Sequence, residues 1–324
     1  ARAFTATSSQ GLLYMAECLF YASGGRFPIV MMNANRSTAL PWNIYGDQRD
    51  SLALLDSGWI QAYAQDAQEA LDLALISYYV AEHKKVQTPF MVNLDGFILT
   101  HTYEVVDVPS AEKADEFLPK FTTDNAFDFA SPKNIAFSAG PDTNTFFKYK
   151  AHKALLNVAG AVEEAEEKFY RIFARRYTGL IETYRIEDAD IAIVTLGSIS
   201  GLVREVIDTL RGSNIKAGLV RLRYVRPFPE KEIVSALKNV VAAAVLEKDI
   251  SFGAQGTVFT NVNSALKASS LAVKTVNYVG GLGGKDISFD EIKGIFSALE
   301  KIAENPNENI DNPVRFLAIE EQNR

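Results

Sequence analysis

The sequence has little cysteine: Cys18 is the single one among 324 residues. A disulfide needs two cysteines, and an iron-sulfur cluster or a cysteine-ligated zinc site needs several, so this chain alone builds none of them. Because Cys18 lies in an apolar stretch with helical spacing, we expect it to be a buried small hydrophobe.

Basic residues are also few. The chain has 33 Lys and Arg against 40 Asp and Glu, a net charge of -7, and a pI near 5.2. A chain with this balance lacks the overall positive charge that favours nucleic acid or an anionic membrane, and we expect neither as a partner. No apolar run reaches the length of about 20 residues that spans a bilayer, and no signal-peptide pattern opens the chain. We therefore expect a cytoplasmic protein.

What is present is the composition of a globular protein, with 48% hydrophobic and 23% charged residues. The length exceeds that of most single cores and favours two domains. The first residues read like a strand in the middle of a domain, without an initiator Met. We expect a first domain incomplete at its N-terminus, a connector with a helix, a second domain, and a tail that needs a partner to become ordered, at 1–104, 105–180, 181–303 and 304–324.

Hydrophobic periodicity defines the first domain. Helical spacing covers 10–22 and 67–82, and continuous apolar runs of strand length cover 28–32 and 89–94. Strand, helix and strand in succession predict parallel pairing with a right-handed crossover. Residues 33–50 form a long loop after a buried strand, which is where open α/β sheets place ligand sites.

The second domain alternates strands with helices. The predicted strands are 191–196, 216–222, 240–246 and 272–278, and the helices between and after them lie near 199–211, 229–238, 257–268 and 288–302. This alternation is typical of a doubly wound sheet. Residues 105–150 contain scattered prolines and little periodicity, which indicates a surface connector, and helical spacing returns from about 149 to 177. The fold class is therefore α/β, with two doubly wound, mostly parallel sheets.

Two polar segments of the first domain stand out. Thr7-Ser8-Ser9-Gln10-Gly11 places hydroxyls and an amide where a strand gives way to a helix, which suits a polar ligand. Alternatively, Ser8 or Ser9 only caps the helix. The loop that starts at Asn35 combines one cation with hydroxyls and two aromatic residues; it can bind a small carboxylate, or its arginine can be a surface ion-pair former. Its members are Arg36, Ser37, Thr38, Trp42, Tyr45 and Asp47.

Other candidates have plainer alternatives. Asp95 lies at a strand terminus and His101 just beyond it, but the first can be a turn former before Gly96 and the second a hydrogen-bonded structural residue. Three strand ends in the second domain carry Gly-rich or small polar turns. None matches the spacing of a dinucleotide site or a P-loop, so close backbone packing is the alternative to phosphate binding. No His or carboxylate spacing indicates a metal site.

The combination of segments resembles one known family over nearly the whole chain. It resembles the subunit of 2-oxoacid:ferredoxin oxidoreductases that carries the thiamine pyrimidine-binding domain. The similar segments are Thr5–Gly11, Asn35–Asp47, Asp56–Gln61, Gln68–Asp72, Asn93–Phe97, Thr100–Thr102, Asp115–Pro119, Lys148–Leu155, Val225–Pro229 and Gly280–Asp286.

The resemblance implies cofactors and partners. Thiamine diphosphate would be shared with a partner subunit that binds its diphosphate through Mg²⁺, and other subunits would hold iron-sulfur clusters and a gamma-type domain. The reaction would oxidatively decarboxylate pyruvate with coenzyme A and pass electrons to ferredoxin, because the cofactor acts as an electron sink. The later domain would resemble the C-terminal domain of transketolases.

The resemblance also implies roles for residues. Arg36 matches the family arginine that holds the substrate carboxylate, with Asn35, Ser37 and Thr38 beside it. Thr7, Ser8, Ser9, Gln10 and Asp47 would contact the cofactor, while Trp42, Tyr45, Asp95 and His101 would lie at the site or at an interface. The family glutamate that hydrogen-bonds the aminopyrimidine, and a threonine near the substrate, belong to a segment before residue 1. Ser37-Thr38 departs from the small apolar residues of relatives, which puts the substrate preference in doubt.

Three alternatives remain open on the sequence alone. The same family type can act on branched 2-oxoacids, 2-oxoglutarate or oxalate. A transketolase-like or 2-oxoacid dehydrogenase component shares this domain pair. A noncatalytic assembly subunit would have the fold without the activity.

Overall fold

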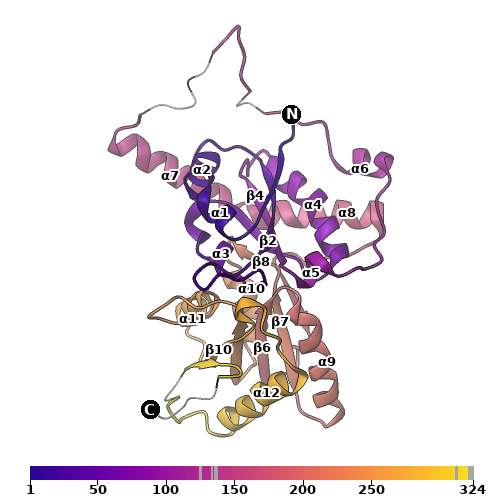
Figure 1. Ribbon diagram of the computed structural model, residues 1–324, viewed down its shortest axis with the longest axis vertical. Coiled ribbons are helices and arrows are strands. Elements are labelled where there is room, and N and C mark those ends of the chain that lie inside the picture. The colour runs from indigo at the N-terminus through magenta and orange to yellow at the C-terminus, as the bar shows by residue number, and fades with distance from the viewer. Residues whose placement is uncertain (124–125, 133, 135–137, 311–312, 320–324) are drawn as a thin grey trace.

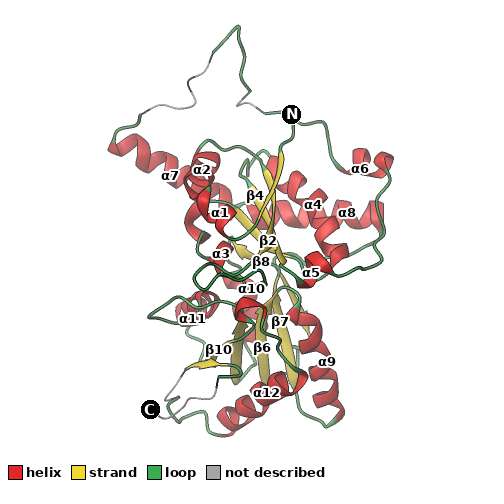
Figure 2. Ribbon diagram, in the orientation of Figure 1, coloured by secondary structure: helices red, strands yellow, loops and turns green. Residues whose placement is uncertain are grey.

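The computed structural model describes residues 1–123, 126–132, 134, 138–310 and 313–319. It contains two α/β units, one above the other in Figure 1, each built on its own sheet (Figure 2). The expectation of two mostly parallel sheets is confirmed. None of the described helices is both long enough and apolar enough to cross a membrane.

The first sheet has the strand order β1-β2-β4-β3-β8. Its members are β1 (Phe4–Thr7), β2 (Val30–Asn35), β3 (Ile60–Tyr63), β4 (Phe90–Asp95) and β8 (Tyr224–Arg226). The first four pair in parallel, and β8 pairs antiparallel with β3. Because β8 follows three strands of the second sheet in sequence, the two units share chain segments.

Alternation along β4 explains how both faces of this sheet are covered. Phe90 and Val92 face a core made with α4 (Ala67–Glu82) and α8 (Val158–Phe173), whereas Met91 faces a smaller core with α1 (Gln10–Tyr14) and α2 (Ala16–Gly24). Successive side chains of a strand point to opposite faces, so a strand covered on both sides reads as a continuous apolar run.

The second sheet has the order β11-β10-β9-β6-β7-β5. Its strands are β5 (Ile181–Tyr184), β6 (Ile191–Leu196), β7 (Ala217–Leu222), β9 (Ala242–Glu247), β10 (Lys274–Val279) and β11 (Val314–Phe316); only β5 is antiparallel to its neighbour. One face packs on α9 (Ile199–Gly212) and α12 (Phe289–Glu304), and the other on α10 (Glu230–Leu237) and α11 (Thr257–Ser269).

Several features differ from the sequence-based expectations. The predicted helix at 10–22 is interrupted at Met15, and Cys18 is exposed on α2, so the expectation of a buried cysteine is wrong. Strand β3 was not predicted, because its four residues include Gln61 and are too short for a pattern to emerge. Part of the tail forms a strand, because β11 pairs with β10. The remaining short elements are α3 (Arg49–Leu52), α5 (Ile98–His101), α6 (Ala111–Phe117), η1 (Leu55–Ser57) and η2 (Leu282–Gly284).

The segment expected to be a connector contains two long helices. Helix α7 (Pro141–Leu156) lies at the periphery of the first unit and is almost entirely exposed (Figure 1). Helix α8, by contrast, contributes Phe169, which is 0% exposed, to the core of the first sheet. A surface connector does not describe this part of the chain, since burial of α8 makes it integral to the first unit.

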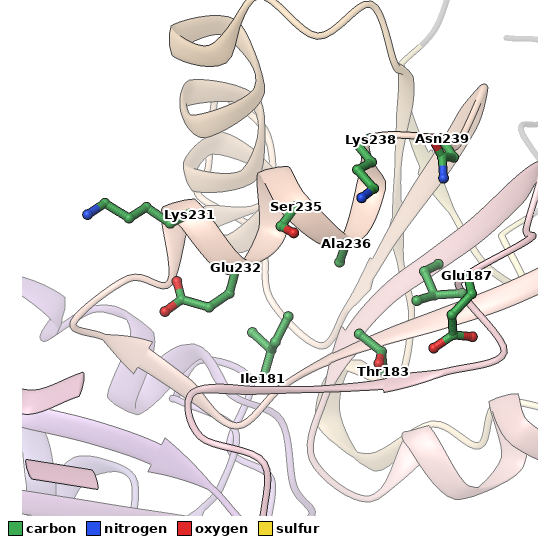
Figure 3. A pocket seen from close by; sticks show the side chains of 10 residues that line it. Ile181, Thr183, Glu187, Lys231, Glu232, Ser235, Ala236, Lys238 and Asn239 are labelled. Atoms are coloured by element: carbon green, nitrogen blue, oxygen red, sulfur yellow. The ribbon is translucent and has the colours of Figure 1, made fainter. Parts of the chain in front are cut away.

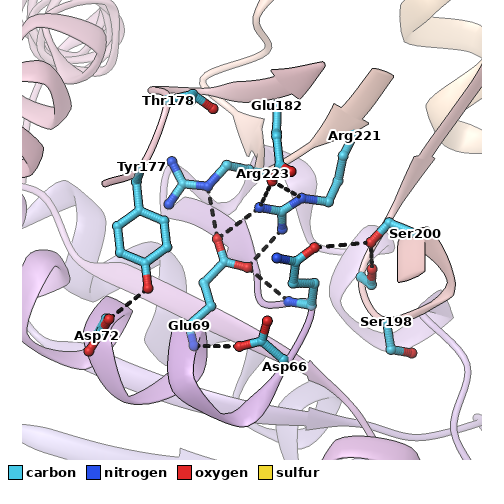
Figure 4. A network of polar contacts seen from close by, with 12 residues as sticks. Asp66, Glu69, Asp72, Tyr177, Thr178, Glu182, Ser198, Ser200, Arg221 and Arg223 are labelled. Carbon is cyan, nitrogen blue, oxygen red and sulfur yellow. Dashed lines mark hydrogen bonds and ion pairs between the residues drawn. The ribbon is translucent and has the colours of Figure 1, made fainter. Parts of the chain in front are cut away.

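Buried ion pairs join α4 to the second unit (Figure 4). The carboxylate of Glu69, at the start of α4, accepts hydrogen bonds from Arg221 at 2.8 and 3.0 Å and from Arg223 at 2.8 Å. All three side chains are about 1% exposed. Burial alone would raise the pKa of Glu69, but the two guanidinium groups lower it to about 2. Arg223 also pairs with Glu166 of α8, so three elements meet at one charged cluster.

Candidate functional site

The candidate site lies at the carboxyl ends of β1, β2 and β4. Ser9, two residues after β1, has a positive φ of 49° and is fully buried. Its hydroxyl donates to the carbonyl of Ser37 at 2.7 Å and makes no capping bond to α1. The alternative in which Ser9 only caps the helix is therefore wrong, because its side chain ties the β1 loop to the β2 loop. Thr7, Ser8 and Gln10 are partly exposed around it.

Asp50 is the polar centre beneath these loops. Its carboxylate accepts hydrogen bonds from the side chains of Asn33 and Asn35 and from the backbone N–H groups of Ser9, Arg36 and Ser51, over 2.7 to 3.3 Å. Burial raises the pKa of Asp50 to about 6 against the effect of these donors. Asp50 is not among the residues predicted from the sequence, because no local pattern distinguishes it from a surface acid in a polar loop.

The side chain of Arg36 is held next to Gln10. Its Nη2 donates to Oε1 of Gln10 at 3.2 Å, and the hydroxyl oxygen of Ser9 lies 2.7 Å from the same oxygen. The Nε of Arg36 is buried and has no hydrogen-bond partner in the part of the chain that the structure describes. No described carboxylate pairs with this guanidinium, so the surface ion pair considered from the sequence is absent among the described residues.

The loop after Arg36 folds back toward the second unit. Ser37 is 8% exposed, and its N–H donates to the carbonyl of Tyr45 at 3.0 Å. Asp47 is buried and accepts from the N–H of Gly283 at 3.1 Å, so the loop is bonded to η2. Burial raises the pKa of Asp47. Thr38 is partly exposed beside Ser37.

Aromatic side chains form the outer rim of this loop. Trp42 is 69% and Tyr45 42% exposed. The ring of Tyr45 packs edge-on against Phe97 at 4.6 Å between centroids, and Phe97 stacks on His101 at 4.7 Å. His101 also hydrogen-bonds Thr100 and is exposed. The structure therefore places Tyr45 and His101 in one exposed aromatic cluster, away from the hydrogen bonds around Asp50.

Asp95, at the end of β4, lies between the two units. Its carboxylate pairs with Lys248 at 3.2 Å and accepts from the N–H of Ser198 at 2.8 Å and from Gln48 at 2.9 Å. Burial would raise the pKa of Asp95, but the Lys248 ammonium and these hydrogen bonds lower it. The carboxyl ends of the two sheets thus meet at a buried ion pair.

Glycines allow this close approach. A Cβ on Gly96 would lie 2.0 Å from the carbonyl oxygen of Asn35, and one on Gly197, which has a φ of 72°, would lie 2.7 Å from Asp95. A Cβ on Gly284 would lie 2.3 Å from that of Tyr45. At Gly197 and Gly284, two of the Gly-rich turns noted in the second domain, the structure thus shows close packing against residues of the first unit.

Several buried polar atoms behind the site have no hydrogen-bond partner among the described residues. They are Oδ1 of Asn33, Oδ1 of Asn35, Oε1 of Gln48 and Nδ2 of Asn93. Such atoms are rare in native proteins and often mark a functional site or ordered water. Within the described residues no grouping of three His, Cys, Asp or Glu side chains could hold a metal ion.

Comparison with known proteins gives a consistent result. The family model described as pyruvate flavodoxin/ferredoxin oxidoreductase, thiamine diphosphate-binding, matches residues 1–167, and the model for pyruvate:ferredoxin oxidoreductase core domain II matches residues 189–292. Pyruvate synthase subunit PorA of Methanothermobacter thermautotrophicus is 43% identical over 95% of this chain and 78% of its own length. Ketoisovalerate oxidoreductase subunit VorA of Pyrococcus horikoshii is 40% identical over 94% of this chain and 77% of its own.

A solved structure shows the same fold at low identity. It is a 2-oxoglutarate:ferredoxin oxidoreductase from Magnetococcus marinus with 2-oxoglutarate, coenzyme A and succinyl-CoA bound, at a TM-score of 0.63 and 17% identity. The match covers 92% of this chain and 53% of that one, so the chain spans about half of the solved protein.

Proposed function

Because the chain belongs to the pyruvate flavodoxin/ferredoxin oxidoreductase family, we propose that it is the thiamine-domain subunit of an enzyme that oxidatively decarboxylates pyruvate. The products would be acetyl-CoA, CO2 and reduced ferredoxin. The identity of 43% to a pyruvate synthase subunit supports pyruvate, and that of 40% to a ketoisovalerate enzyme subunit makes a branched 2-oxoacid the second candidate.

The observation that carries the proposal is the state of the Arg36 guanidinium. It is fixed by Gln10, no described carboxylate neutralises it, and its Nε lacks an acceptor among the described residues. The carboxylate of a 2-oxoacid supplies the missing charge and acceptor, and the planar fork of an arginine matches both carboxylate oxygens. Ser37 and Thr38, adjacent in the chain, are the residues we propose to affect the choice of 2-oxoacid, with Asn35 holding the loop through Asp50.

The chemistry at the carbonyl carbon belongs to thiamine diphosphate, which when bound stabilises the negative charge left by loss of CO2. The residues at the end of β1 fit its pyrimidine end, because the hydroxyls of Thr7 and Ser8 are partly exposed and make no hydrogen bond to described residues. Ser9 and Gln10 would position this segment, since their side chains are bonded to each other and to the Arg36 loop. Asp47 would act on the cofactor only through the loop, because its carboxylate already accepts N–H groups of Arg49 and Gly283.

Partner subunits complete the proposal. We assign to them the Mg²⁺ and diphosphate end of the cofactor, the iron-sulfur clusters and the gamma-type domain, with ferredoxin and coenzyme A as co-substrates. The low cysteine content of this chain supports the division, because an iron-sulfur cluster usually takes about four thiolate ligands and Cys18 is the single cysteine. The cytoplasm is the compartment we propose, since it supplies these co-substrates. Trp42, Tyr45 and His101 are proposed to contact a partner, because all three side chains are exposed.

The test is reduction of a viologen dye by the purified complex with coenzyme A and a panel of 2-oxoacids. We expect the highest kcat/KM with pyruvate and dependence on added thiamine diphosphate after cofactor removal. Preference for a branched acid, 2-oxoglutarate or oxalate would change the proposed substrate but keep the proposed reaction type. Product transfer to a sugar or to lipoamide without dye reduction would favour a transketolase-like or dehydrogenase component, and no 2-oxoacid oxidation at all would favour an assembly subunit.

A further inference from the structure

A pocket lies at the amino ends of β2 and β4, opposite to the carboxyl ends at which Arg36 is found. It has a volume of about 690 Å³ and is formed by the end of α2, the loop after α4, and α7. The chain leaves these loops directly into β2 and β4, whose far ends carry Asn35 and Asp95. Since a strand of six residues spans roughly 20 Å, this pocket is separate from the candidate site.

The lining of this pocket is strongly basic. It contains five cationic side chains and no carboxylate among the described residues: Arg26, Lys84, Lys85, Lys150 and Lys153. None of the five forms a salt bridge with a residue that the structure describes. In a chain with a net charge of -7, an unneutralised cluster of this size creates a local positive potential that attracts anions.

Arg26 is a fixed member of the cluster. It has a positive φ of 60°, and its guanidinium donates to the backbone carbonyls of Val86, Gln87 and Lys150. Carbonyls hold the group in place without cancelling its charge, and an arginine remains protonated at neutral pH. Burial lowers the pKa of Arg26.

Two aromatic side chains of α7 complete the lining. The rings of Phe147 and Tyr149 are 43% and 57% exposed. Aromatic faces beside cations are the arrangement with which proteins bind a flat heterocycle that carries phosphates. The volume lies within the range of roughly 300 to 1,000 Å³ typical of small-molecule sites.

We propose that this basic pocket binds an organic polyphosphate with a flat ring, of the nucleoside triphosphate class. The phosphates would contact the lysines and Arg26, and the ring would pack on Tyr149 and Phe147. A pocket of similar size in the second unit, about 570 Å³, is lined by side chains of both charges: Glu187 and Glu232, with Lys231 and Lys238 (Figure 3). It provides a matched control.

The experiment is calorimetric titration of ATP and of tripolyphosphate into the purified complex, with thiamine diphosphate and coenzyme A saturating so that their own sites are filled. We expect saturable ATP binding that weakens with added salt. The double variant Lys84→Ala, Lys85→Ala should weaken it about tenfold or more, and Lys231→Ala, Lys238→Ala should leave it unchanged. Tyr149→Ala should remove the preference for ATP over tripolyphosphate. Because Lys84, Lys85 and Tyr149 are exposed, we expect unchanged melting temperatures and unchanged 2-oxoacid oxidation without ATP.

Three results would overturn the proposal. The first is no saturable ATP binding by the unmodified complex. The second is equal binding by the Lys84→Ala, Lys85→Ala variant. The third is loss of a partner subunit from that variant, measured by size-exclusion chromatography, which would assign the pocket to an acidic surface of that subunit. None of them depends on which 2-oxoacid the enzyme uses.

Discussion

Arg36 and Asp50 contact the same two loops, but they differ in how their charge is satisfied. Asp50 is fully buried and accepts five N–H donors. Its carboxylate is therefore satisfied within the protein, and these hydrogen bonds hold the ends of β1 and β2 together. Arg36 is partly exposed and has one side-chain acceptor among the described residues, Oε1 of Gln10. A cation with unused donors at a strand end is the group that a small carboxylate would complete.

Replacement of Arg36 by alanine should lower kcat/KM for pyruvate by roughly tenfold or more, since a hydrogen bond to a charged group is worth about 1.5 to 3 kcal/mol. Arg36→Lys should recover part of this loss, because lysine keeps the charge without the planar fork. Viologen reduction by the complex measures the effect. Arg49→Ala is the control, because that guanidinium lies over the ring of Phe252. Unchanged kinetics for Arg36→Ala would remove this residue from the site.

Helix starts differ in how they are capped. Ser9 precedes α1 without a capping bond, whereas Ser288 forms a capping box with Glu291 at the start of α12. Ser288→Ala should therefore destabilise the protein by about 0.5 to 2 kcal/mol, and Ser288→Asp should cost less because aspartate also accepts the backbone N–H. Urea denaturation of the two variants measures this. Equal stability of wild type and Ser288→Ala would show that α12 is fixed by packing alone.

The start of α11 carries a buried acid instead. The carboxylate of Glu247, 1% exposed, accepts from the N–H groups of Val258 and Phe259 and from the side chain of Asn277. Burial raises the pKa of Glu247 from 4.5 to about 8, against the effect of these hydrogen bonds. The folded protein therefore binds a proton here that the unfolded chain releases at lower pH.

This pKa predicts a pH dependence of stability. Because the folded-state pKa is the higher one, the contribution of Glu247 is fully present below about pH 4.5 and is lost as the pH rises through about 8. The free energy of unfolding should fall over this window by up to roughly 5 kcal/mol. Glu247→Gln, which cannot ionise, should flatten the slope in denaturant titrations between pH 5 and 8. An identical slope in both proteins would show that Glu247 is ionised throughout.

At the scale of the whole molecule, the two units are joined by charges rather than by apolar contacts alone. Glu69 of α4 is paired with Arg221 and Arg223 of the second unit, and Asp95 of β4 is paired with Lys248. A buried ion pair contributes little net stability, but removal of one partner leaves a charge buried without compensation. These ion pairs fix the carboxyl ends of the two sheets next to each other.

Glu69→Ala should consequently destabilise the protein by about 3 to 5 kcal/mol, because two buried guanidinium groups lose their anion. Glu167→Ala provides the control: Glu167 pairs with Arg176 at 3.9 Å with both side chains exposed, and such a pair is worth about 0 to 1 kcal/mol. Thermal and urea unfolding of the two variants measure the difference. A similar small effect of both substitutions would mean that water reaches the Glu69 cluster.

Local patterns along the chain were sufficient to predict the layers of the fold, while the family was indicated by the resemblance of particular segments to known relatives. Continuous apolar runs predicted β4, β6, β7 and β9, because strands covered on both faces lose the alternation of polar residues, and helical spacing predicted α4, α9 and α11. The polar strand ends at Ser9, Arg36 and Asp95 were recognised for the same local reason, although their roles remain predictions.

Contacts between residues that are distant in the sequence were decided by the tertiary structure alone. It placed β8 in the first sheet, brought Asp50 under Arg36, and paired Asp95 with Lys248 and Glu69 with two arginines. It also gathered the five cations of the basic pocket from three separate segments. The periodicity of hydrophobic residues indicates the secondary structure and the buried face of a single segment. Pairings across tens to hundreds of residues depend on how whole elements pack, which no local pattern encodes.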